Sequence, residues 1–209
     1  MKMSTPRFRR PASLSLADQD LLPGEPDPAT STDLAHRSAE ALVAQVRQSA
    51  DDEVVRRVVA LAQTEGLDDL AALWSTSPAG TLPGALWRLY VLHAWVQRDP
   101  EDVVRRYREG SRTVPGLRYL AGLSEPPDVP SVRRTLDQIL RGAFTGDLAM
   151  ALGRAAAVLM LVSYGTAHLA DAEPDPRRQG ELTGEAGRLL STGEELAVAA
   201  RLEEAGDLS

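Results

Sequence analysis

The sequence predicts an all-α protein that folds as a single bundle of about six helices. Apolar residues recur at helical spacing through most of residues 31–170, and capping residues, prolines and glycines mark the ends of these stretches. Hydrophobic residues make up 43% of the chain but aromatic residues only 4%, so the core must consist mainly of Leu, Val and Ala. A length of 209 residues suits one domain, with or without tails.

Charge and composition divide the chain into three parts. Residues 1–30 hold five prolines and no apolar periodicity, which predicts a disordered tail. Residues 31–170 hold 15 basic and 16 acidic residues and form the predicted helical domain. Residues 171–209 hold 4 basic and 10 acidic residues, so this acidic C-terminal segment is predicted to be weakly ordered, partly helical or disordered.

Three helices are predicted in the first half of the domain. The first covers residues 32–49 and is opened by Ser31 or Thr32. Residues 52–65 carry an apolar stripe of valines and end at Gly66, and residues 67–74 form a short third helix.

The next two predicted helices follow each other directly. One begins at Thr81 or Leu82, with Pro83 in its first turn, and ends at Arg98. Asp99 then caps a helix that runs to about Glu109, where Gly110 is expected to close it.

Residues 111–130 are predicted to be a long connection with one helical turn around Leu117–Leu120. A helix over residues 131–141 should end at Gly142. Asp147 or its neighbour should cap the last helix of the domain, which extends to about Ala170, and residues 194–205 form a weak terminal helix.

The most apolar stretch, Leu148–Ala170, has about the length of a membrane span. It contains Arg154 and His168, and charged groups are costly at membrane depth. We therefore expect no membrane span but a helix buried on most sides by its neighbours. The helices of the domain are predicted to pack around two central segments, residues 82–98 and 147–170.

Missing residue types exclude several chemistries. The chain has no Cys and no Asn, and its single lysine is Lys2, so thiol nucleophiles, thiolate metal sites and a phosphate-loop lysine are absent. We expect no cofactor and no metal site. The basic N-terminal residues precede no apolar run, which predicts a cytoplasmic protein, and 22 arginines against one lysine are typical of a GC-rich bacterial genome.

Arg88 and His93 are the candidate catalytic residues. Their Arg-x4-His spacing resembles the motif of the HEPN superfamily, many of whose helical members are metal-independent ribonucleases. The resemblance implies that Arg88 stabilises a phosphate and that His93 polarises the 2′-hydroxyl, in a site completed across a dimer. In this chain Leu89 follows the arginine, where the family usually has a polar residue.

Helical spacing also favours another role for His93. Five residues at ~100° each place Arg88 and His93 roughly 140° apart, so they converge only on a kinked helix or with a second chain. His93 lies in a stripe with Leu86, Leu89 and Val96, which indicates a core histidine with one hydrogen bond.

Trp74, Trp87 and Trp95 fall within 22 residues of an aromatic-poor chain. They mark either the densest part of the core or a possible interface. Residues 58–74 have a helix–Gly–helix form, but the second helix carries two aspartates and no basic residue, so we do not expect nucleic acid as a partner.

Together these features predict a non-enzymatic interaction or regulatory protein with a protein partner or a second copy of itself. Binding would use a helix-lined groove or a homo-oligomeric face. A metal-independent ribonuclease that uses Arg88 and His93 is the alternative.

Overall fold

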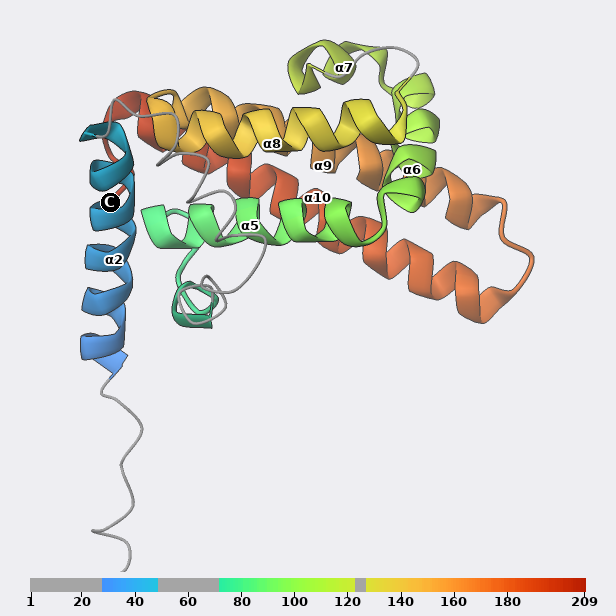
Figure 1. Cartoon of the computed structure of the whole chain (residues 1–209). Coiled ribbons are helices and arrows are strands. Elements are labelled where there is room, and N and C mark those ends of the chain that lie inside the picture. Colours follow the sequence, from blue (N-terminus) through green and yellow to red (C-terminus); the bar gives the residue numbers. More distant parts are fainter. Residues whose placement is uncertain (1–27, 49–71, 123–126) are drawn as a thin grey trace, which may run out of the picture.

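The computed structural model describes residues 28–48, 72–122 and 127–209, and its regular structure within these ranges is entirely α-helical (Figure 1). This confirms the predicted all-α class. The helices are α2 (Pro28–Gln48), α5 (Leu82–Arg98), α6 (Pro100–Thr113), α7 (Pro115–Ala121), α8 (Val129–Thr145), α9 (Leu148–Asp171) and α10 (Pro176–Ala205).

The predicted N-terminal elements are described only in part. Residues 1–27 of the expected tail lie outside the described residues, and α2 begins at Pro28, slightly earlier than predicted. The predicted helix 52–65 lies outside as well. Of the predicted helix 67–74, residues 72–74 are described and are helical.

Helix α9 is the centre of the bundle. It contacts α5, α6, α7, α8 and α10, with its longest interface along α10. Figure 1 shows α8, α9 and α10 lying alongside one another, with α7 above them and α2 crossing one end. By length and composition α9 is apolar enough to cross a membrane, but 67% of its most apolar window is buried inside the protein. Such burial is typical of a core helix.

Helix starts follow the predicted caps. The Thr81 hydroxyl accepts from the amide of Gly84 at 3.3 Å and opens α5. Asp99 caps α6 by accepting from the amide of Asp102, and Asp147 caps α9 by accepting from the amide of Met150. These bonds satisfy amides that have no partner within the first helical turn.

Gly110 does not end α6, and this prediction was wrong. The helix continues to Thr113, and Gly110 faces Gly165 where α6 crosses α9. A β-carbon at Gly110 would lie 1.8 Å from the Leu161 carbonyl oxygen, and one at Gly165 would lie 1.7 Å from that of Arg106. The two glycines therefore permit a backbone approach that no other residue allows.

The region between α6 and α9 contains more helix than predicted. Residues 115–121 form α7, which ends at Gly122 in the left-handed conformation (φ 69°). Helix α8 passes through Gly142 and ends at Gly146, whose φ is 136°, so Gly142 was wrongly assigned as its stop.

A reciprocal capping box opens α8. The carboxylate of Asp128 accepts from the amide of Ser131 at 2.7 Å, and the hydroxyl of Ser131 accepts from the amide of Asp128 at 2.9 Å. These contacts with Ser131 lower the pKa of the Asp128 carboxyl, because hydrogen bonds to the ionised form stabilise it.

The acidic C-terminal segment differs most from the expectation of weak order. Residues 176–205 form α10, a helix of 30 residues that packs antiparallel along α9. Its buried face contains small residues, including Ala186, Gly193 and Ala200. The buried Ser163 hydroxyl of α9 also donates to the Ala186 carbonyl at 2.7 Å. Small side chains gave a weak hydrophobic signal in the sequence but allow a close interface in the fold.

Candidate functional site

The structure does not bring Arg88 and His93 together. Both belong to α5, but Arg88 points toward α10, where its Nε donates to Glu195 Oε2 at 2.7 Å. His93 points toward α8, where its Nε2 lies 2.9 Å from Asp137 Oδ1. Helical spacing predicted this separation, and α5 carries the two side chains into different environments.

His93 is a buried histidine with a carboxylate partner. Only 2% of its side chain is exposed, against 36% for Asp137. Because an ionised carboxylate only accepts hydrogen bonds, His93 Nε2 must carry the hydrogen that joins them. The amide nitrogen of Gln97 lies 3.3 Å from the same Nε2 and 3.4 Å from Asp137 Oδ1. Because the protonated Nε2 cannot accept a hydrogen bond, the Gln97 amide donates to the carboxylate.

Although His93 is buried, its ring also borders a crevice between α5 and α8. The crevice encloses about 540 Å³. Its lining combines aromatic, basic and acidic side chains: Tyr90, His93, Ala94, Gln97, Arg98, Arg133 and Asp137. We call this feature the α5–α8 crevice.

A second hollow of different character lies between α5 and α10 and encloses about 210 Å³. Its floor is Leu159 of α9, and its walls are mostly apolar: Val91, Leu92 and Trp95 from α5, and Leu189 and Thr192 from α10, with Arg88 and Glu185 at the rim. Val91 is 44% exposed although it is a β-branched hydrocarbon. We call this feature the α5–α10 groove.

The three tryptophans occupy different positions. Trp74 is buried in the core, and its indole N–H donates to Ser38 Oγ at 3.0 Å. Trp87 is half-buried and stacks on Tyr90 with ring centroids 5.8 Å apart. Trp95, also half-buried, lines the α5–α10 groove. Trp95 therefore lies at a hollow in the surface.

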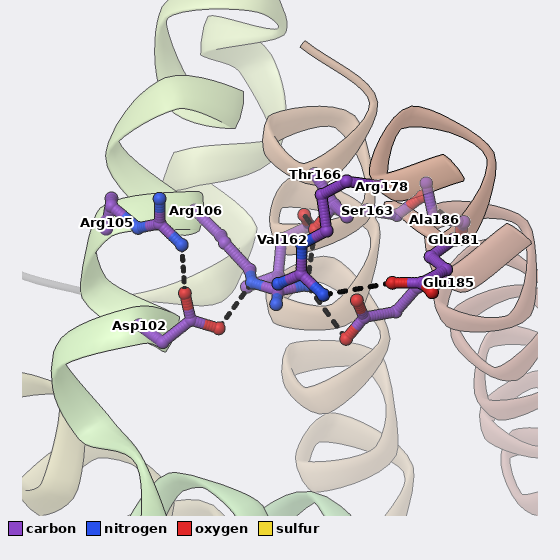
Figure 2. Close-up of polar contacts among 10 residues, drawn as sticks. All are labelled: Asp102, Arg105, Arg106, Val162, Ser163, Thr166, Arg178, Glu181, Glu185 and Ala186. Atoms are coloured by element: carbon purple, nitrogen blue, oxygen red, sulfur yellow. Dashed lines mark hydrogen bonds and ion pairs between the residues drawn. The ribbon is translucent and has the colours of Figure 1, made fainter. Parts of the chain in front are cut away.

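Behind the groove lies a buried arginine, which Figure 2 shows between α6, α9 and α10. Arg106 Nη1 lies 2.9 Å from Glu185 and donates to the Thr166 hydroxyl at 3.1 Å. Its Nε forms an ion pair with Asp102, and its guanidinium lies 5.8 Å from the Trp95 ring centroid.

Spacing within α6 explains only part of this cluster. Asp102 and Arg106 are four residues apart on α6, a spacing that favours an ion pair, and only 7% of the Arg106 side chain is exposed. Arg105 pairs with the same carboxylate, that of Asp102. Glu185 lies 79 positions beyond Arg106 in the sequence, so no local pattern could predict the ion pair between them.

Across the described ranges, no group of three or more His, Asp or Glu side chains is placed to hold a metal ion. The chain matches no family model, and neither the curated proteins nor the solved structures contain a match to it. Its function therefore has to be argued from its own geometry.

Proposed function

We propose that this is a non-enzymatic, cytoplasmic helical interaction protein whose α5–α10 groove binds an amphipathic helix of a protein partner. The main support for this proposal is the exposed apolar groove, in which Val91 and Trp95 border a floor formed by Leu159. At about 210 Å³ the groove is smaller than the ~300–1,000 Å³ typical of small-molecule pockets. A hollow of this size suits a few apolar side chains spaced along one face of a helix.

Charge indicates the type of helix. The chain carries a net charge of −7, and residues 171–209, which include the α10 wall, hold 10 acidic and 4 basic residues. A partner helix with Lys or Arg beside its apolar stripe would be attracted, and an acidic helix repelled. The Arg88–Glu195 pair at the rim holds α5 and α10 in a fixed relation, which lowers the ordering cost of binding.

The test uses a designed helical peptide with leucines at i, i+3, i+4 and i+7 and lysines elsewhere. Binding to the full chain is followed by tryptophan fluorescence, because Trp95 lines the groove. Val91→Glu should weaken binding at least about tenfold, since it buries a carboxylate under the peptide. Val198→Glu is the matched control, because Val198 is 43% exposed but lies outside the groove lining.

Three results would contradict the proposal. Equal loss of binding in both valine variants would show that the groove is not the contact surface. Equal binding of a peptide with glutamates in place of the lysines would remove the charge argument. Sedimentation showing a dimer that Val91→Glu dissociates would make a second copy of the chain the occupant.

A further inference from the structure

The α5–α8 crevice lies across α5 from the proposed groove and has a different chemistry. Of its seven lining residues, two are arginines, one is an aspartate and one is the buried His93. With His93 neutral, the formal charge of the lining is +1, in a chain of −7. A locally positive hollow can attract a small anion even in an acidic protein.

Among the described residues, no ion pair joins either crevice guanidinium to a carboxylate. Within the described residues Arg88, Arg105, Arg106, Arg112 and Arg178 each form an ion pair with an acidic side chain. Neither Arg98 nor Arg133 forms such a pair there. Arg133 instead donates through Nη2 to the carbonyl of Gln97 at 3.2 Å, which ties its guanidinium to the end of α5 at the crevice.

The acidic member of the lining is already occupied. Asp137 accepts from His93 Nε2 at 2.9 Å and lies 3.4 Å from the Gln97 amide nitrogen, both on the Oδ1 atom. These donors stabilise the carboxylate through Oδ1, and no ion pair within the described residues joins it to Arg98 or Arg133. His93, whose side chain is only 2% exposed, thus anchors one oxygen of Asp137 at the edge of the crevice.

From this arrangement we infer that the α5–α8 crevice binds a phosphate-bearing small molecule, with Arg98 and Arg133 holding the phosphate. Guanidinium groups match phosphate oxygens in geometry as well as charge. The volume of about 540 Å³ lies within the range for small-molecule pockets, and Tyr90 supplies an aromatic wall for the remainder of the ligand. The inference does not depend on the proposed protein-binding groove.

The test begins with NMR of the histidine ring protons of the full chain, which has 3 histidines. Inorganic phosphate, pyrophosphate and AMP are titrated separately to concentrations on the order of millimolar. The His93 ring signals should shift, while those of His36 and His168, which do not line the crevice, stay in place. Tighter binding of AMP than of phosphate identifies an organic phosphate ester, and equal binding identifies the phosphate group itself. Absence of a His93 shift with all three probes overturns the inference.

Variants then locate the phosphate by calorimetry. Arg98→Gln and Arg133→Gln should each weaken pyrophosphate binding about tenfold, because a lost hydrogen bond to a charged group costs about that factor. Arg134→Gln is the control, since this exposed arginine neighbours Arg133 on α8 but is not part of the lining. Thermal melts of each variant establish that it is folded. Equal weakening by the control overturns the assignment.

Asp137→Asn tests whether the crevice prefers a negatively or a positively charged ligand. Removing this negative charge while keeping the side-chain shape should tighten pyrophosphate binding severalfold, because the carboxylate repels the anion. A cationic ligand would behave in the opposite way. Weaker pyrophosphate binding in Asp137→Asn, with the fold intact, would therefore contradict an anion site.

Discussion

Replacement of Gly110 by alanine tests the closest contact in the bundle. The new β-carbon would lie 1.8 Å from the Leu161 carbonyl oxygen, whereas ordinary contact begins at 3.4 Å, so α6 and α9 must separate by about 1.6 Å. The obstructing atoms are backbone and cannot rotate away. Overpacking of a core costs ~1–3 kcal/mol, and this site belongs at the upper end of that range.

Alanine also favours the helix by about 1 kcal/mol relative to glycine, which offsets part of the clash. We therefore expect Gly110→Ala to lower the free energy of unfolding by about 2 kcal/mol. For a chain of 209 residues this corresponds to a fall in Tm of roughly 4–8 °C. The assay is thermal unfolding followed by circular dichroism at the helical minimum.

The matched control is Gly187→Ala. Gly187 is exposed in the middle of α10, and a β-carbon built there meets nothing within 4 Å. This variant should raise stability by about 0.5–1 kcal/mol through helix propensity alone. A Gly110→Ala protein as stable as the parent would refute the proposed close crossing of α6 and α9.

Three further predictions concern buried charge, pH and catalysis. Arg106→Met should lower the free energy of unfolding by about 2 kcal/mol in urea titrations. This is less than the ~3–5 kcal/mol expected for a fully buried pair, because the carboxylate partners of Arg106 reach solvent. The control Arg105→Met, at a side chain 58% exposed, should change stability little. Hydrogen bonding with Ser131 lowers the pKa of Asp128, so its ionised carboxylate stabilises the fold at pH values above the ordinary pKa of 3.8. This stabilisation is lost as the pH falls from 3.8 through the lowered pKa of the folded state. Asp128→Asn should therefore show a flatter dependence of Tm on pH in acid. Purified His93→Ala and the parent should be indistinguishable in RNA cleavage assays, and selective loss of cleavage in the variant would favour the ribonuclease alternative.

Local chemistry explains which parts of the fold could be predicted. Thr81, Asp99 and Asp147 were identified as helix starts because a cap needs only the residues of its own first turn. Gly110 and Gly142 were misassigned as helix stops, because a glycine inside a helix has the same local appearance as one that ends it. At Gly110 the deciding contact comes from α9, more than 50 positions along the chain.

The same limit applies to the candidate sites. The burial of His93 followed from its place in an apolar stripe, but its partner Asp137 is 44 residues away. Arg88 and Glu195 are 107 residues apart in the sequence, and their contact depends on α10, which was not predicted at its full length. Pairings of this kind arise from tertiary packing, which the spacing of residues within one helix does not encode.

The central position of α9 has a consequence for the motions of the protein. Its backbone amides are enclosed by five neighbouring helices, so their hydrogens should exchange with deuterium in the solvent only when the whole bundle opens. The short α7, with Tyr119 75% exposed and Leu120 63% exposed, should exchange through local opening at much lower cost. The slowest-exchanging amides would then report the global stability, and α7 would mark the part of the bundle that loosens first.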